Sequence, residues 1–185
     1  EVIGTLGRHP VDSDTTIYLV EDYEDIEKLK INSSDIAYVT QTTLSVDETK
    51  GLIEALKVKY PQIIGPSADD ICYATQNRQD AVKQLSLECE IVLVIGSKTS
   101  SNSNRLKELA EKCGTKSFLI DDKSDINIEE LKQTMSVGIT AGASAPEEIV
   151  QEVISFLYPL GYKTVRNLSE NNESMTFKLP KELAD

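Results

Sequence analysis

The sequence predicts an α/β fold in which two pseudo-related domains each contain a small, mostly parallel sheet. Short apolar runs alternate along the chain with segments of helical period, and strands that alternate with helices usually pair in parallel. Three of the apolar runs also lead directly into turns rich in Ser, Thr and Asn that open a helical pattern. These runs and their turns cover residues 36–43, 91–104 and 137–144.

The first part of the chain contains the signals of two strands and two helices. We predict strands at 16–20 and 36–39 and helices at 22–29 and 45–60. The second helix begins at Ser45, which has capping-box spacing to Glu48, and it ends before Pro61. Gly65 and Pro66 then interrupt the pattern, so we expect a domain boundary near residue 66.

The second part repeats this arrangement. We predict strands at 91–95, 117–120 and 137–140 and helices at 75–87, 106–113, 128–132 and 144–157. Gly114 is expected to end the second of these helices. Ser144 and Glu147 have capping-box spacing at the start of the last one. Residues 162–165 and 175–179 are expected to pair as a terminal hairpin, which divides the chain into 1–66, 67–160 and a tail at 161–185.

Composition excludes several classes of function. A net charge of -12 argues against a nucleic-acid partner, because phosphate backbones are bound mainly through an excess of Lys and Arg. No apolar stretch approaches the about 20 residues of a membrane span, and the start does not resemble a signal peptide. We therefore expect a cytoplasmic protein. The chain begins on Glu1 rather than Met, which suggests a piece of a longer protein.

The three polar turns are candidates for an anion site. A strand that runs into such a turn leaves hydroxyls and N–H groups at a helix N-terminus, where partial positive charge favours phosphate. The alternative is that these side chains only cap helices. A helix needs one capping side chain, whereas the middle turn offers seven Ser, Thr and Asn residues within 97–104, so the surplus favours a ligand such as a diphosphate.

The cysteines differ in their surroundings. Cys72 follows two aspartates and precedes a helix, a setting that favours the thiolate needed in a nucleophile or metal ligand. Cys89 enters a strand, and Cys113 lies on the apolar face of a helix, so both are expected to be buried structural residues. A metal or cluster at Cys72 would need ligands from elsewhere. Glu1 lies near Gly4 and Gly7, but alone it would be a surface carboxylate.

Several long strings resemble 4-hydroxy-3-methylbut-2-enyl diphosphate reductases, the iron–sulfur enzymes of the last step of the methylerythritol phosphate route to isoprenoids. The strings occur in the family's order along nearly the whole chain. They are EVIGT at 1–5, YVTQTTLSVD at 38–47, DDICYATQNRQ at 69–79, GSKTSSNSNRL at 96–106, TAGASAP at 140–146 and LPKEL at 179–183.

The resemblance implies a role for particular residues. In that family three α/β domains surround a 4Fe-4S cluster held by three cysteines, and this chain resembles most of the second domain, the third and the C-terminal tail. Cys72 then corresponds to one cluster ligand, Glu1 to the acid that protonates the departing hydroxyl, and Thr42 to a residue that holds this acid and the substrate. The implied diphosphate ligands are Ser100, Ser101, Asn102 and Ser144.

The implied reaction is a reductive dehydroxylation that yields isopentenyl or dimethylallyl diphosphate, with ferredoxin or flavodoxin as the electron donor. The family's N-terminal third, which supplies the other two cysteine ligands, has no counterpart here. We therefore expect this fragment alone to fold but to be inactive. The alternatives are an isomerase-like sugar-phosphate-binding domain, which gives Cys72 no role, and a non-catalytic phosphate sensor, which needs neither Cys72 nor Glu1.

Overall fold

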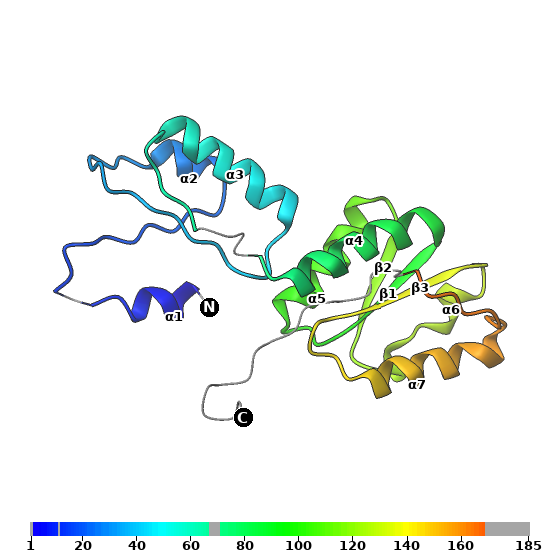
Figure 1. Ribbon diagram of the computed structural model, residues 1–185. Coiled ribbons are helices and arrows are strands. Elements are labelled where there is room, and N and C mark those ends of the chain that lie inside the picture. The colour runs from blue at the N-terminus through cyan, green and yellow to red at the C-terminus, as the bar shows by residue number, and fades with distance from the viewer. Residues whose placement is uncertain (1, 11, 67–70, 169–185) are drawn as a thin grey trace, which may run out of the picture.

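The protein has an α/β fold with an all-parallel sheet of three strands (Figure 1). The structure is a computed structural model that describes residues 2–10, 12–66 and 71–168. The strands are β1 (Ile91–Ile95), β2 (Lys116–Ile120) and β3 (Val137–Ala141), in the order β2-β1-β3. The predicted fold class, with its parallel sheet, is confirmed.

The central strand β1 organises the core. All five of its residues are buried, as expected of a continuous Ile, Val and Leu run that has helices on both faces. Ile91 pairs with Lys116 of β2 and with Val137 of β3, and the register continues without a break to the end of each strand. The three strands therefore end at the same edge of the sheet.

Alternate residues of β1 point to opposite faces of the sheet. Val92 and Val94 pack with residues of α4 (Tyr73–Glu88) and α5 (Ser101–Lys112). Leu93 and Ile95 pack with α6 (Ile128–Leu131) and α7 (Glu147–Leu157). Figure 1 shows α4 and α5 together on one face and α7 on the other. Two short 3-10 helices complete this part: η1 (Lys123–Asp125) lies between β2 and α6 in the sequence, and η2 (Tyr158–Leu160) directly follows α7.

Helix α5 ends where its sequence predicts, but it begins inside the predicted polar turn at 97–104. Ser100 is the N-cap, and its side chain accepts a hydrogen bond from the backbone N–H of Ser103. Gly114 has φ of 86°, a left-handed conformation that glycine adopts without steric cost, and it turns the chain at the helix end. Cys113 is exposed at the C-cap, so the prediction that it is buried is wrong. The helical face does not extend to Cys113, because the last helical residue is Lys112.

The N-terminal elements are α1 (Val2–Gly7), α2 (Tyr23–Lys28) and α3 (Val46–Lys59). Helices α2 and α3 are joined by Tyr60, whose hydroxyl donates to the carbonyl of Leu29 at 2.9 Å and accepts from the N–H of Ile31 at 3.2 Å. Only a single parallel bridge, between Ala37 and Ile64, forms among the described residues of this part.

The predicted strand at 16–20 is not present. Ile17, Tyr18 and Leu19 are all more than two-fifths exposed, and no strand among the described residues pairs with them. An extended segment becomes a strand only when a neighbour satisfies its N–H and C=O groups. The predicted strand at 36–39 is likewise reduced to the bridge at Ala37.

Two predicted capping boxes and the terminal hairpin also need correction. Ser45 is the N-cap of α3 but makes no side-chain cap bond, and Glu48 pairs with Lys112 instead. Pro146, not Ser144, is the N-cap of α7. Residues 162–165 are not in a strand, and the other half of the hairpin, 175–179, lies outside the described residues. The domain boundary near residue 66 stays a prediction.

Candidate functional site

The candidate site lies where the parallel strands end. The backbone N–H of Gly96 donates to Ile120 at 2.9 Å, and that of Gly142 donates to Ile95 at 2.8 Å, so both glycines extend the ladders by one residue. Helix α5 follows β1 after a short turn, which brings its N-terminus to this edge. In open α/β sheets this carboxyl edge is the usual place for a ligand.

The two glycines allow α5 to approach the sheet closely. A Cβ on Gly142 would overlap the hydroxyl of Ser103, and so would a Cβ on Gly96. Ser103 is buried, and its hydroxyl donates to the hydroxyl of Ser100 at 3.1 Å. Packing therefore favours glycine at positions 96 and 142, because a side chain at either one would overlap the hydroxyl of Ser103.

Ser100 has a structural role in this arrangement. Its hydroxyl oxygen accepts from both the backbone N–H of Ser103, at 3.3 Å, and the hydroxyl of Ser103. Its interpretation as a helix cap is thus correct for this residue. A capping hydroxyl still lies at the helix N-terminus, next to the first N–H groups, which have no intrahelical acceptor.

Asn102 has an unusual environment. The residue is 7% exposed, yet neither Nδ2 nor Oδ1 has a hydrogen-bond partner among the described residues. Nδ2 lies 3.7 Å from the position that a Cβ on Gly142 would occupy, so the amide is next to the turn after β3. An unpaired buried amide costs about 1–3 kcal/mol. Such a cost in the first turn of a helix indicates a place for a polar ligand.

The turn at 42–45 joins the same site from the other part of the chain. The hydroxyl of Thr43 is hydrogen-bonded to the hydroxyl of Ser101 at 3.1 Å. The carbonyl of Thr42 accepts from the backbone N–H of Cys72 at 3.2 Å. The side chain of Thr42 is exposed. Two of the three polar turns therefore meet directly, and the third, at 142–146, lies against Asn102.

Cys72 is the N-cap residue of α4. Its carbonyl accepts from the N–H groups of Thr75 and Gln76, at 2.8 and 3.0 Å, which closes the first turn of the helix. Its thiol makes no cap bond and is partly exposed. Cys72 therefore lies close to the turn at 42–45, through its bond to Thr42, with its sulfur free of a capping role.

Ser144 lies in the third turn, and its side chain is exposed. The N–H of Ala145 donates to the carbonyl of Gly142 at 3.0 Å, which closes the turn without the Ser144 hydroxyl. Since Pro146 is the N-cap, Ser144 is not used in capping α7.

Sequence reasoning missed Arg78 and Gln79, which hold two of the turns. The Arg78 side chain donates from Nε to the carbonyl of Ala141 at 3.2 Å and from Nη1 to that of Ala74 at 3.0 Å. Gln79 donates from Nε2 to the carbonyl of Leu44 at 2.8 Å. Both belong to the DDICYATQNRQ string, but nothing in the local pattern indicates which distant carbonyls they bind.

The other two cysteines lie away from these turns. The sulfur of Cys89 packs against Gly138, and burial raises the pKa of the Cys89 thiol. Cys113 lies at the opposite end of α5 from Ser100. Within the described part of the chain, no group of three or more His, Cys, Asp or Glu side chains could hold a metal ion. Glu1 lies outside the described residues, so its predicted position is not tested.

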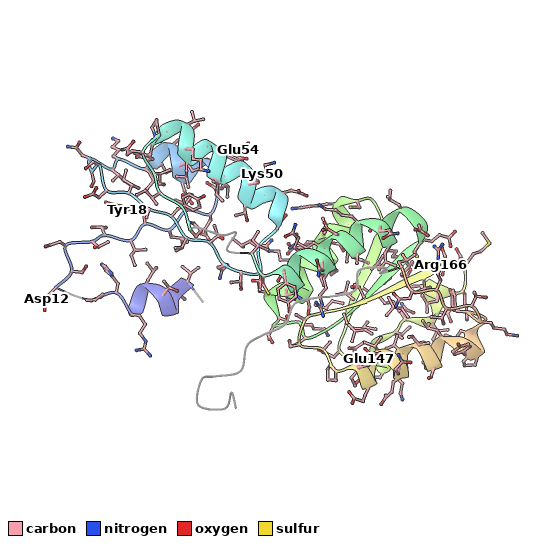
Figure 2. All side chains as sticks on the ribbon, viewed as in Figure 1. Asp12, Tyr18, Lys50, Glu54, Glu147 and Arg166 are labelled. Carbon is pink, nitrogen blue, oxygen red and sulfur yellow. The ribbon has the colours of Figure 1, made fainter. Side chains whose placement is uncertain are left out.

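A surface hollow away from these turns has the wrong charge for an anion. It lies along α7 and is lined by Lys123, Glu147, Glu148, Gln151, Glu152, Ser155 and Phe156. Figure 2 shows Glu147 at the start of this helix, where its carboxylate is exposed. Lys123 is already paired with Glu152 at 3.0 Å. The first turn of α7 is therefore acidic, whereas the first turn of α5 has no acidic residue.

None of the helices among the described residues is long and apolar enough to cross a membrane.

Comparison with known proteins gives consistent matches. The model of the LytB protein family matches residues 1–158. The chain is 53% identical over 184 residues to the 4-hydroxy-3-methylbut-2-enyl diphosphate reductase of Saccharophagus degradans and 51% identical over 184 residues to that of Methylococcus capsulatus. Each match covers 99% of this chain. The chain spans 59% and 58%, respectively, of the length of these two relatives.

A solved structure gives the same result for the fold. The E-1-hydroxy-2-methyl-but-2-enyl-4-diphosphate reductase from Plasmodium falciparum superimposes with a TM-score of 0.81 and 33% sequence identity. The match covers 89% of this chain and 53% of the Plasmodium chain.

Proposed function

This chain belongs to the LytB protein family, and we propose that it is part of a reductase that converts 4-hydroxy-3-methylbut-2-enyl diphosphate into isopentenyl and dimethylallyl diphosphate. The names of its curated relatives support this proposal. Since the chain spans about three-fifths of their length, we assign the activity to a full-length protein. By this we mean the chain together with the remaining part that its relatives possess.

The observation that carries the proposal is the unpaired, buried amide of Asn102 in the first turn of α5. A diphosphate oxygen would accept from Nδ2 and from the first N–H groups of the helix, and it would remove the cost of the unpaired donor. The first turn of α5 contains no acidic residue that would repel it. An anion can thus be bound here even though the chain carries a net charge of -12.

Hydroxyl groups would complete the diphosphate site. We propose that Ser101 and Ser100 donate from the first turn of α5 and Ser144 from the turn after β3. Ser101 is exposed, and its bond to Thr43 can be exchanged for one to a phosphate oxygen because both partners are hydroxyls. The exposed hydroxyl of Ser144 has no capping role to give up.

Cys72 fits one ligand position of an iron–sulfur cluster. Its thiol is partly exposed, is not used in capping and lies at the start of α4. We propose that it holds a 4Fe-4S cluster together with two cysteines from the remaining part of the full-length protein. When bound, the cluster would supply the electrons of the reduction.

The other residues bind substrate and move protons. The reaction consumes two electrons and two protons, breaks the allylic carbon–oxygen bond and releases water. We propose that the carboxyl of Glu1 gives its proton to the departing hydroxyl. A carboxyl beside a diphosphate holds its proton more strongly, because a like charge disfavours ionisation. Thr42, exposed next to Cys72, would orient that hydroxyl. The electron donor would be a ferredoxin or flavodoxin.

The test uses the full-length protein, purified without oxygen. We expect brown protein that converts the substrate to the two diphosphate products with a reduced low-potential donor. Cys72→Ser should lose iron, colour and turnover, whereas Cys113→Ser, an exposed cysteine far from the site, should retain all three. A Cys72→Ser protein with full iron content would contradict the ligand assignment. If the full-length protein binds diphosphate but shows no turnover, that result would favour a non-catalytic phosphate sensor.

A further inference from the structure

The turn at 42–45 is held by the side chain of one buried glutamine. Gln79 lies on α4, two turns after Cys72, and is 3% exposed. Its Nε2 donates to the carbonyl of Leu44 at 2.8 Å. The N–H of Cys72, which precedes the same helix, donates to the carbonyl of Thr42 at 3.2 Å. The turn is therefore hydrogen-bonded to Cys72 and α4 at two carbonyls, those of Thr42 and Leu44.

Two exposed ion pairs also link α3 to α4 and α5. Lys83 pairs with Asp47 at 2.9 Å, and Lys112 pairs with Glu48. The hydrogen bond to Asp47 raises the pKa of Lys83. Exposed pairs of this kind contribute little, because water screens them and long side chains lose entropy. The bond of Gln79 is different, because the Gln79 side chain is buried and its removal would leave the carbonyl of Leu44 without this donor.

We propose that Gln79 is a positioning residue, which fixes the Thr42–Leu44 turn relative to the N-terminal ends of α4 and α5. This inference rests on the proposed function. Thr42 would orient the reacting hydroxyl, and Asn102 and its neighbours would hold the diphosphate. A loosened turn would then lower turnover and leave diphosphate binding intact, because the diphosphate ligands lie on α5 and after β3.

The test compares Gln79→Glu and Gln79→Leu in the full-length protein. Gln79→Glu keeps the shape of the side chain, but its carboxylate cannot donate to Leu44. We expect kcat to fall about 10-fold or more, since small misplacements of an orienting group have effects of this size. The affinity for inorganic diphosphate and the iron content should stay within about 2-fold of the wild type, because the proposed diphosphate ligands lie on α5 and after β3 and Cys72 contacts the turn only through its backbone N–H.

The pH dependence of turnover in Gln79→Glu separates loss of the hydrogen bond from loss of packing, because loss of packing alone would not depend on pH. A buried carboxyl holds its proton to higher pH, and the protonated form can donate to Leu44. The ratio of Gln79→Glu turnover to wild-type turnover should therefore rise as the pH is lowered. The ratio for Gln79→Leu should stay low at every pH. The control is Gln84→Glu, the same change at an exposed position of α4, which should behave as the wild type.

Wild-type kcat in both Gln79 variants would overturn this inference while leaving the proposed function in place. Unchanged kcat with diphosphate affinity weakened 10-fold or more would also overturn it, because the residue would then act on the diphosphate rather than on Thr42. Gln79→Glu could also show no recovery at low pH although Gln79→Leu loses turnover, and that result would exclude the hydrogen bond as the cause. An inactive wild-type protein would contradict the proposed function itself.

Discussion

The hydroxyl of Thr43 is hydrogen-bonded to the hydroxyl of Ser101 at 3.1 Å, although the two residues are 58 positions apart in the chain. Thr43 follows the bridge at Ala37, and Ser101 is the first residue of α5. This contact joins the N-terminal elements to the carboxyl edge of the sheet. It places two of the polar turns next to one another.

Because the amide of Asn102 is unpaired, its removal should stabilise the ligand-free protein and weaken diphosphate binding. Asn102→Leu replaces it with an apolar group, so the free energy of unfolding of the ligand-free protein should rise by about 1 kcal/mol or more. The affinity for diphosphate should fall by at least about 10-fold, which corresponds to roughly 1.4 kcal/mol. Denaturant unfolding and calorimetric titration measure the two quantities.

The matched control for this variant is Asn104→Leu. The side chain of Asn104 donates to the carbonyls of Lys98 and Ser100, at 2.8 Å each, so its removal should lower stability. Asn102→Leu would contradict the assignment if it destabilised the protein as much as Asn104→Leu does.

Ser100→Ala and Ser144→Ala should differ in their effect on the stability of the protein but should weaken diphosphate binding alike. Ser100→Ala removes the N-cap of α5 and should cost about 1 kcal/mol of unfolding free energy. Ser144→Ala removes an exposed hydroxyl without a capping role and should change stability by less than about 0.5 kcal/mol. Both variants should weaken diphosphate binding by about 1–3 kcal/mol. Unchanged affinity in both would show that these hydroxyls do not contact the ligand.

The glycines at the sheet edge allow a double-mutant cycle with Ser103. Gly142→Ala should lower the unfolding free energy by about 1–3 kcal/mol, because the new Cβ overlaps the hydroxyl of Ser103. Adding Ser103→Ala should recover much of that loss, since the Cβ of Ser103 would lie 3.6 Å from the new atom.

Gly96→Ala is the control for this cycle. A Cβ there would lie 2.9 Å from the Cβ of Ser103, so Ser103→Ala should not rescue it. Equal rescue at the two glycines, measured by denaturant unfolding, would mean that α5 shifts as a whole rather than being held at Ser103.

The cysteines should differ in their rates of alkylation. The thiolate is the nucleophile, and burial raises the pKa of Cys89, so near pH 8 Cys89 should react more slowly than the exposed Cys113. Above pH 8 the alkylation rate at Cys89 should increase with pH, because more of this thiol ionises. Mass spectrometry after timed treatment with iodoacetamide follows each site. Equal rates at Cys89 and Cys113 would contradict the difference in their environments.

The local pattern of the sequence predicted the sheet and its helices well. A continuous Ile, Val and Leu run at 91–95 predicts a buried strand, and Gly114 marks the end of α5. These features are readable because they depend on a few neighbouring residues. The strand predicted at 16–20 is absent for the opposite reason, since a strand depends on a pairing partner from another part of the chain.

Chain order and turn chemistry by themselves determined that polar turns follow the parallel strands and open helices, because the carboxyl ends of parallel strands share one edge. Only the tertiary structure decided which polar side chains are already satisfied: Ser100 is used as a cap, Gln79 binds Leu44, and Asn102 is buried without a partner among the described residues. Hydrogen-bond satisfaction depends on which groups meet in space, and for a buried side chain those groups come from distant parts of the sequence.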